Sequence, residues 1–383
     1  MAVQIIDSVA GLADWRKAWE DLVLNATEPN PFLEPFFLLP ALENITTLPF
    51  KILLVCPESA NGDPNRRLIG FLPLASKFRY GGLPVHFLSG ATHVHCFVGT
   101  PLMRHGYEEQ CLQTLLKWFS TLPRREMFVE LRDCYLDGTV YQVLQILLKK
   151  EGYSWEEIAL DPRPYLRVPA NLESYDSQLH DHKIGKELRR KRRRCEELGE
   201  LHVDLLTEKN DLEIWCNTFL DMEASGWKGD AKSALKCSQS ELAFFRKVVS
   251  NGFAEQRLLF FRLRLGDIPV AMHCCFLCGG TLFLFKIAYD EAYGKISPGM
   301  ILHYEIIKYA IASGIRAIDS CTDTANRMLG HLLPQHRQRC HLNVETGRTL
   351  SHYFTKNILR LRQLSRRFTA GAAGSTCHNS EPK

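Results

Sequence analysis

The same order of expected secondary-structure elements occurs twice along this chain, and this repeat limits the folds available to it. In the first half, apolar stretches predict strands at 50–56, 67–76 and 94–98, a helix at 108–119 and a strand at 126–132. In the second half, they predict strands at 257–265, 269–278 and 281–288, a helix at 300–312 and a strand at 315–320. We therefore expect an α/β fold with two similar halves, each a mixed, mostly antiparallel sheet flanked by helices.

The expected boundary between the halves lies at Asp161-Pro162-Arg163-Pro164, because two prolines in close succession interrupt regular elements. A length of 383 residues fits two domains. We therefore expect an N-terminal half at 1–164 and a C-terminal half at 165–369. Residues 370–383 are small and polar, and we expect them to form a disordered tail.

Charge and cysteine content favour some cellular settings over others. Lysine and arginine number 47 against 43 acidic residues, and a net charge of +4 is too small to make nucleic acid the default partner. The 13 cysteines lie mostly in apolar runs, which suits reduced thiols. The first residues also lack the basic region of a secretory signal, so we expect a cytoplasmic protein.

Two features resemble sites that we do not expect this chain to form. The windows 80–103 and 268–285 lack charged residues over the length of a membrane span, but glycines inside both predict turns between buried strands, so no span is expected.

Cys275 and Cys278 match a C-x-x-C metal motif without a second pair nearby. Strand alternation also places them on opposite faces, so we expect no metal.

The segment 285–302, FKIAYDEAYGKISPGMIL, has the pattern of a strand, a loop and the start of a helix. Ser297 is a natural N-cap residue, and Pro298 occupies the favoured first helical position. Gly299 lacks a side chain, so a ligand can approach the backbone closely. The unpaired N–H groups of a first helical turn form a site for a phosphate, although a plain strand-to-helix connection has the same local pattern.

Three stretches in this order and spacing resemble the BioF2-like (CelD-like) acetyltransferase family of the GNAT superfamily. They are KELRRKRRRCEELG at 186–199, ASGWKGDAKSAL at 224–235, and the segment at 285–302 continued by 318–339. The chain is also similar to FemAB-type aminoacyltransferases, which carry two GNAT-like halves. The resemblance covers residues 165–345 well, and it implies that the fold consists of two tandem GNAT-like halves.

The resemblance implies an acyl-CoA-dependent N- or O-acyltransferase with acetyl-CoA as the simplest donor. The acceptor would be an amine or hydroxyl of a small molecule or saccharide, and relatives are linked to polysaccharide biosynthesis. GNAT enzymes hold the CoA pyrophosphate with a loop of the form R/Q-x-x-G-x-G/A, which Ser297-Pro298-Gly299 matches in part. Gly294 stands where Arg or Gln is usual, and we expect Lys295 to supply part of the missing charge.

The same resemblance suggests roles for other side chains. Tyr289 is expected to protonate the leaving thiolate, and Tyr293 and Tyr304 remain alternatives for this role. Asp319 is expected to act as general base because of its position, since the carboxyl ends of strands border the ligand crevice in open sheets. Trp227, Lys228 and Arg337 are expected to bind the substrate. Alternatives remain: Asp319 as a turn cap, Trp227 as a buried anchor beside a solvated Lys228, and Arg337 on a surface turn.

The basic stretch at 186–194 keeps a second function open. In a FemAB-like aminoacyltransferase this stretch would contact aminoacyl-tRNA, whereas in an acyl-CoA enzyme it would lie near phosphate groups or in solvent. A non-catalytic GNAT-like binding protein is a third possibility, because the loop lacks its usual Arg or Gln.

Overall fold

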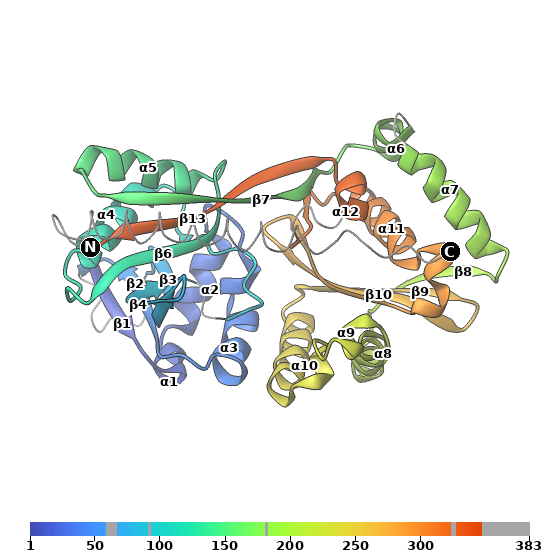
Figure 1. Cartoon of the computed structure of the whole chain (residues 1–383), viewed down its shortest axis with the longest axis horizontal. Helices are drawn as coiled ribbons and strands as arrows, with labels where there is room; N and C mark the ends of the chain where they lie inside the picture. The colour runs from blue at the N-terminus through green and yellow to red at the C-terminus, as the bar shows by residue number, and fades with distance from the viewer. Residues whose placement is uncertain (59–66, 91–92, 181–182, 323–326, 347–383) are drawn as a thin grey trace, which may run out of the picture.

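A computed structural model describes residues 1–58, 67–90, 93–180, 183–322 and 327–346 (Figure 1). The expected tail at 370–383 lies outside the described residues. The strands are β1 (Ala2–Ile6), β2 (Phe50–Cys56), β3 (Gly70–Tyr80), β4 (Leu83–Ser89), β5 (Leu102–Met103), β6 (Glu126–Tyr135), β7 (Trp155–Arg167), β8 (Leu201–Leu205), β9 (Leu258–Leu265), β10 (Ile268–Cys278), β11 (Thr281–Tyr289), β12 (Ala317–Asp319) and β13 (Gln335–Glu345).

Helices connect these strands and cover the sheet. They are α1 (Val9–Ala13), α2 (Arg16–Leu24), α3 (Pro35–Asn44), α4 (Glu108–Phe119), α5 (Thr139–Glu151), α6 (Leu172–His180), α7 (Lys183–Glu196), α8 (Leu212–Ser225), α9 (Trp227–Asp230), α10 (Gln239–Ala254), α11 (Pro298–Ala312) and α12 (Arg327–Leu332). Short 3-10 helices include η5 (Glu291–Ile296) before α11. None of the helices in the described part of the chain combines the length and the apolar character needed to cross a bilayer.

One 13-stranded mixed sheet runs through both halves, in the order β1-β2-β3-β4-β6-β13-β7-β12-β11-β10-β9-β8, with β5 paired to β3. The expected repeat is present. In each half, antiparallel strands lead to one parallel pair, which is β4 with β6 and β11 with β12. The connections carry α4 and α11, as a parallel pair requires a crossover. The expected fold class is therefore confirmed.

The two halves exchange their last strands at the centre of the sheet. β7 follows β6 in the chain, but β13 lies between them, and β7 pairs instead with β12. β13 follows β12 in the chain, but it pairs with β6 and β7. Figure 1 shows β7 and β13 as long strands that run from one half into the other. Neither half therefore completes its sheet with its own chain.

Prolines did not interrupt the chain where we expected. Pro162 and Pro164 lie inside β7, which runs through the expected boundary at residue 164. Proline lacks an N–H but keeps its carbonyl, and the carbonyl of Pro164 accepts a hydrogen bond from the Ser320 N–H at 3.2 Å. The division into halves at 1–164 and 165–369 therefore stays a prediction, and β7 continues from one of these halves into the other.

A second difference concerns the stretch at 94–98, which we expected to be a strand. Its described residues form a loop without sheet partners. The side chains of this loop pack on elements of the C-terminal half, with the ring centroids of Phe97 and Phe285 6.0 Å apart. Tertiary packing thus accounts for the apolar pattern.

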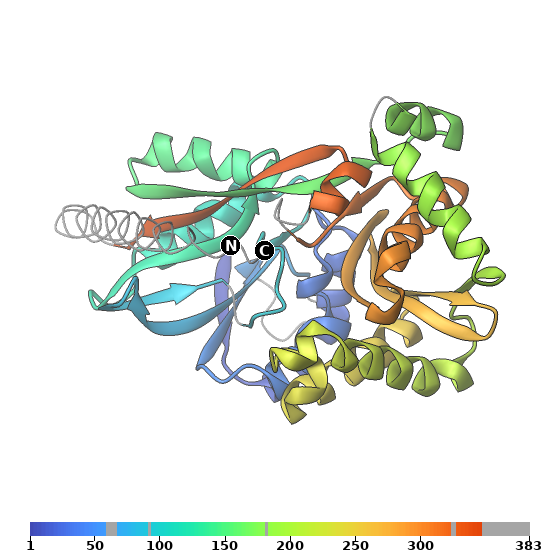
Figure 2. The same cartoon turned by 45° about the vertical axis from the view of Figure 1, so that its right-hand side comes forward.

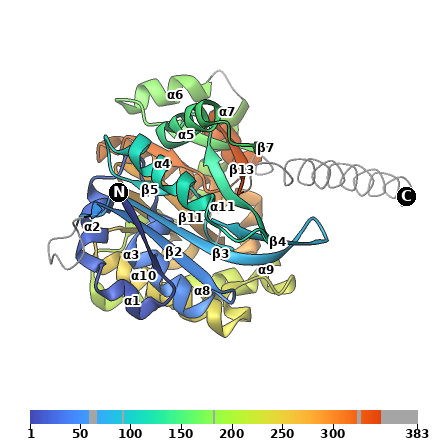
Figure 3. The same ribbon diagram turned by 90° about the vertical axis from the view of Figure 1, so that its left-hand side faces the viewer.

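Helices cover both faces of the sheet in each half. Figure 3 shows α4 and α5 on one face of the N-terminal strands and α1, α2 and α3 on the other. In the C-terminal half, α11, α7 and α6 cover one face, and α8 and α10 cover the opposite face (Figure 2). Buried apolar clusters between the helices and the strands form the core on each face.

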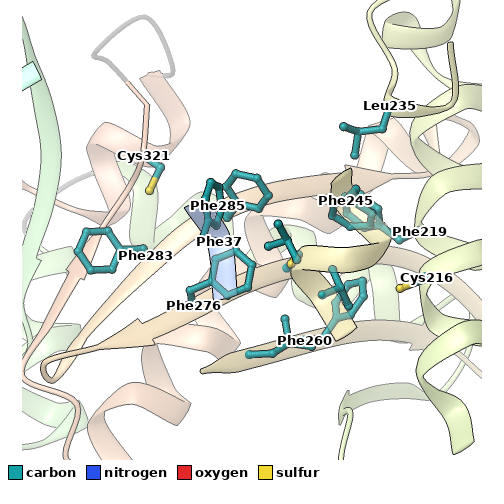
Figure 4. Close-up of a cluster of buried hydrophobic side chains, with 14 of the residues drawn as sticks. Phe37, Cys216, Phe219, Leu235, Phe245, Phe260, Phe276, Phe283, Phe285 and Cys321 are labelled. Atoms are coloured by element: carbon teal, nitrogen blue, oxygen red, sulfur yellow. The ribbon is translucent and has the colours of Figure 1, made fainter. Parts of the chain in front are cut away.

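An aromatic cluster joins the two halves on the α8 and α10 side. Phe37 of α3 packs edge-on against Phe276 of β10 and Phe285 of β11, with 5.8 and 5.3 Å between the ring centroids (Figure 4). It also packs edge-on against Phe244 of α10, with 5.4 Å between the ring centroids. Edge-to-face pairs at such distances are favourable beyond their burial. The N-terminal half therefore supplies part of the C-terminal core.

Candidate functional site

A cavity of about 610 Å³ opens where β11 and β12 diverge. The two strands pair in parallel only from Thr281 opposite Ala317 to Phe283 opposite Asp319. Beyond this point β11 continues without a register partner in β12. Residues 284–289 line one side of the cavity and residues 320–322 line the other. The diverging strand ends thus form a slot between residues 284–289 and residues 320–322. The extended backbone of β11 forms one wall of this slot.

A β-bulge in β11 lies at the start of the slot. Pairing with β10 shifts from Phe276 opposite Phe283 to Cys274 opposite Lys286, so β11 holds one extra residue. A bulge bends its strand and changes the direction of the following side chains. Phe285 and Ala288 both pack in the cluster on the α8 and α10 side, which strict alternation would forbid.

The first turn of α11 forms another wall of the cavity, through Ser297, Pro298 and Gly299. Pro298 occupies the first helical position, as expected. A Cβ at Gly299 would lie 3.3 Å from Ile287 Cδ1 and 3.6 Å from Tyr289 Cδ1, so a larger side chain would crowd the slot. The absence of a side chain at Gly299 therefore leaves space beside the orphan N–H groups of the helix.

Ser297 does not cap α11 with its side chain, contrary to our expectation. Its backbone adopts the left-handed conformation, with φ 54°, and its hydroxyl makes no capping hydrogen bond. The contribution of Ser297 comes from its carbonyl, which accepts the Met300 N–H at 3.0 Å. Residues that cap a helix with their side chain usually have an extended backbone, and the left-handed backbone of Ser297 departs from it, which explains the difference.

Trp227 and Lys228 also line the cavity, together with Tyr289. They form the start of the short helix α9. The N–H of Trp227 donates to Glu291 Oε1 at 2.8 Å, which ties α9 to η5. Trp227 is 56% exposed and Tyr289 is 37% exposed, so both aromatic rings are accessible to a ligand.

Lys228 forms an ion pair within the cavity wall. Its Nζ donates to Glu223 Oε1 at 2.8 Å, and the other oxygen of Glu223 accepts the Leu235 N–H at 2.9 Å. Glu223 is buried, and both of its carboxylate oxygens are occupied. Lys228 is therefore neither a free cation nor a solvated surface residue.

Asp319 does not line the cavity, although Ser320 and Cys321 after it do. Its carboxylate is fully buried, accepts hydrogen bonds from the Tyr135 hydroxyl and, at 2.9 Å, from the Cys321 N–H, and lies 3.7 Å from Arg163 Nη1. The residue joins β12 to β6 and β7 at the strand exchange. The geometry therefore favours the alternative of a structural carboxylate over that of a general base.

Arg337 and Lys295 also lie away from the cavity lining. Arg337 binds Asp137 with an Nη2–Oδ1 distance of 2.8 Å, and its guanidinium lies 3.5 Å from the centroid of the Tyr135 ring. Lys295 has an exposed side chain, and its carbonyl accepts a hydrogen bond from Lys191 Nζ at 2.6 Å. Neither residue supplies a charge to the slot in this arrangement.

The basic helix α7 borders the loop before α11. Besides the contact between Lys191 and Lys295, Arg192 forms ion pairs with Glu305 of α11 and with Glu196, the latter at 3.0 Å. Arg189, Arg190 and Arg193 are exposed on the same helix. The basic helix α7 therefore packs beside η5 and α11, close to the expected phosphate site, which is one of the positions that the sequence analysis left open for it.

Two buried histidines line the cavity and were missed by the sequence analysis. His273 of β10 and His303 of α11 are joined by a contact of 3.1 Å between their Nε2 atoms. Burial lowers the pKa of His303 to about 4 and that of His273 well below its usual value. No local pattern connects two histidines on different elements, so only the fold reveals the pair.

Lys286 was also missed, although the sequence contained a signal for it. It is the single charged residue in the apolar stretch of β11, and it lines the cavity. A lone lysine in a buried strand is unusual, because burial of an ammonium group is unfavourable.

In the part of the chain that the structure describes, no three His, Cys, Asp or Glu side chains come together as a set of metal ligands.

Buried histidines make the stability of the fold sensitive to acid. Burial lowers the pKa of His93 to about 3, and burial with the nearby charge of Lys286 lowers that of His95 to about 2. Below pH about 6.5 these histidines become protonated in the unfolded chain but stay neutral in the folded chain. The free energy of unfolding should therefore decrease by about 1.4 kcal/mol for each such histidine with each unit by which the pH falls.

Urea unfolding between pH 7.5 and pH 5.5 measures this slope. The variant His93→Gln should reduce the slope by the contribution of one histidine. His105→Gln, at a side chain that is 85% exposed, should leave the slope unchanged. Equal slopes for the wild type and His93→Gln would contradict the assignment of His93 as a neutral buried group.

Comparisons with known proteins identify this architecture. Residues 182–326 match the acetyltransferase (GNAT) domain family. The structure is similar to that of FemX, with a TM-score of 0.55 and 10% identity over 90% of this chain and 96% of that chain. A conserved protein of unknown function from Bacteroides thetaiotaomicron gives a TM-score of 0.55 and 11% identity over 90% of this chain and 99% of its own.

A third similar structure is the C-terminal domain of an Agrobacterium fabrum protein assigned as a lysylphosphatidylglycerol synthetase. It gives a TM-score of 0.52 and 9% identity over 89% of this chain and 94% of that chain. At such identities the similarity shows the fold alone. No curated protein matches the sequence significantly. Residues 182–326 therefore match a GNAT acetyltransferase domain, and the chain as a whole shares its fold with FemX and with the C-terminal domain of the Agrobacterium fabrum protein.

Proposed function

We propose that this protein is an acyl-CoA-dependent acyltransferase whose donor binds in the slot between β11 and β12. The divergence of the strands after Phe283 and Asp319 is the observation that carries this proposal. The edge of β11 that no longer faces β12 offers N–H and C=O groups to the amides of a pantetheine chain. Acetyl-CoA is the simplest donor for a cavity of about 610 Å³.

The phosphates of the donor would lie at the first turn of α11. Gly299 leaves the backbone accessible there, and the N–H groups of a helix start favour anions. Lys191 of α7 contacts η5 just before this turn, and the basic residues of α7 would supply positive charge in place of the Arg or Gln that is missing at Gly294. Long-range attraction of this kind strengthens anion binding even without direct contact.

Transfer would proceed directly from the thioester to an amine or hydroxyl of a small molecule or saccharide. Tyr289 lines the slot and is accessible, so its hydroxyl is our candidate for protonating the leaving thiolate. Trp227 supplies an exposed ring for the acceptor, and Lys228 holds Glu223 in place behind it. Asp319 and Arg337 have no part in this scheme, because they lie outside the cavity lining.

A FemAB-like aminoacyltransferase is the second candidate, favoured by one observation. The basic face of α7 borders the entrance of the cavity and is open to a polyanion such as tRNA. Both candidates place an activated acyl group in the slot and phosphates at its entrance, and they differ in the size of the donor.

Calorimetry with acetyl-CoA, CoA and tRNA separates the candidates. We expect acetyl-CoA to bind with one site per chain, and tRNA to bind only weakly or not at all. Tight tRNA binding with a steep dependence on salt, without CoA binding, would favour the aminoacyltransferase. Binding of none of these ligands would favour a non-catalytic protein.

A charge-reversal variant tests the contribution of α7. Changing Arg189, Arg190 and Arg193 to glutamate leaves the ion pair between Arg192 and Glu305 intact. We expect the affinity for acetyl-CoA to fall by less than about tenfold, because exposed charges act through solvent. A complete loss of acetyl-CoA binding by a folded variant would mean that α7 contacts the donor directly.

A further inference from the structure

Lys286 lies inside the cavity at the point where the slot begins. Residue 286 follows the bulge in β11, and its backbone pairs with Cys274 of β10. Its Nζ lies 5.5 Å from the centroid of the Phe285 ring. Because alternate residues share a face, its side chain lies on the same side as Ala288, toward α8 and α10.

The amine of Lys286 has no ion pair or hydrogen bond with another described residue. Among the carboxylates, Glu223 acts most strongly on Lys286, but Lys228 and the Leu235 N–H already occupy both oxygens of Glu223. Lys228 forms the ion pair with Glu223, whereas Lys286 lines the same cavity without taking part in this pair. The cavity therefore holds one paired lysine and one unpaired lysine.

The surroundings of Lys286 make its amine easier to deprotonate than that of an exposed lysine. Burial and, to a smaller extent, the positive charge of Lys228 lower the pKa of its amine, against the raising effect of Glu223 and Glu241. A neutral amine has a free electron pair and is a nucleophile, which a protonated lysine is not.

We propose that Lys286 accepts an acyl group from acyl-CoA bound in the slot, so that the protein acylates itself inside its own cavity. The inference rests on the proposed use of acyl-CoA. It also depends on the position of Lys286, whose backbone forms the slot wall and whose side chain enters the same cavity. The amine of Lys286 is therefore a nucleophile in the cavity where the donor is proposed to bind.

The step balances with acyl-CoA as the only co-reactant. The amine nitrogen of Lys286 forms a bond to the thioester carbonyl carbon, and the carbon–sulfur bond breaks. CoA leaves as a thiolate and takes up the proton that the nitrogen loses. The product is a neutral amide, which does not pass the acyl group on and which occupies space that an acceptor would need. Self-acylation therefore ends in a form with a partly filled cavity.

Mass spectrometry of the intact wild-type protein incubated with acetyl-CoA tests the proposal. We expect one acetyl group per chain, located on Lys286 by peptide mapping. Labelling of Lys286 should be about tenfold or more faster than that of the exposed Lys247 of α10, because a bound donor is held at a high effective concentration beside Lys286 and the lowered pKa of Lys286 favours the nucleophilic form. An excess of free CoA should suppress labelling at Lys286 and not at Lys247.

Two variants provide independent controls. Lys286→Met and Lys286→Arg should each lose the single release of CoA thiol that occurs without any acceptor, since neither new side chain is a nucleophilic amine. If acetyl-CoA binds by calorimetry but Lys286 is labelled no faster than Lys247, self-acylation is refuted and the proposed function stands. If acetyl-CoA neither binds nor labels the protein, both proposals fall.

Discussion

Replacing Asp319 with alanine should lower the free energy of unfolding by about 3–5 kcal/mol, the range for breaking a buried ion pair by removing one partner. The change would leave Arg163 buried beside an empty site and would remove the acceptor of the Tyr135 hydroxyl. These residues lie on β12, β7 and β6, where the halves exchange strands. Urea unfolding at pH 7.5 measures the loss.

Asp137→Ala is the matched control for Asp319→Ala. Asp137 is also paired with an arginine, but its side chain is 55% exposed. Its loss should lower the free energy of unfolding by about 1 kcal/mol or less, as for other solvated ion pairs. If Asp319→Ala were as stable as this control but inactive, Asp319 would be the general base that its place at a strand end suggested.

Gly299→Val should weaken acetyl-CoA binding more than about tenfold, which corresponds to about 1.4 kcal/mol. The Cβ of the new side chain would approach Ile287 and Tyr289 and fill the entrance of the slot at the start of α11. Calorimetry of the folded variant measures the change in affinity.

Gly330→Val provides the control for this substitution. Gly330 lies on α12 outside the cavity lining, and a Cβ there meets nothing within 4 Å. We expect this variant to bind acetyl-CoA with the affinity of the wild type. Unchanged affinity in Gly299→Val itself would place the donor phosphates elsewhere.

Local patterns in the sequence predicted the repeated strands and helices, because each buries an apolar face that its periodicity reveals. They did not predict the exchange of β7 and β13. The pairing of Arg339 with Tyr135, for example, joins residues from opposite halves, and no local pattern names a strand's partner. The two prolines of β7 then suggested a break in the chain, whereas the strand continues through them.

The candidate site was predicted best where a backbone pattern defines it. The strand, loop and helix around Gly299 follow from proline and glycine at a helix start, and the structure brings Trp227, Lys228 and Tyr289 to the same cavity. Asp319 was assigned from its place at a strand end. Its side chain faces away from the cavity, toward Arg163 of β7. The sequence does not predict that Arg163 lies beside Asp319, because the two residues are on different strands.

Hydrogen exchange with and without acetyl-CoA tests most directly whether the donor lies in the slot. A donor in this position would protect the backbone amides of residues 284–289 and of the first turn of α11, 299–301, which line the cavity or adjoin it. We expect protection at both segments at a saturating concentration of acetyl-CoA. Protection confined to other segments, or none at either segment, would contradict the proposed site.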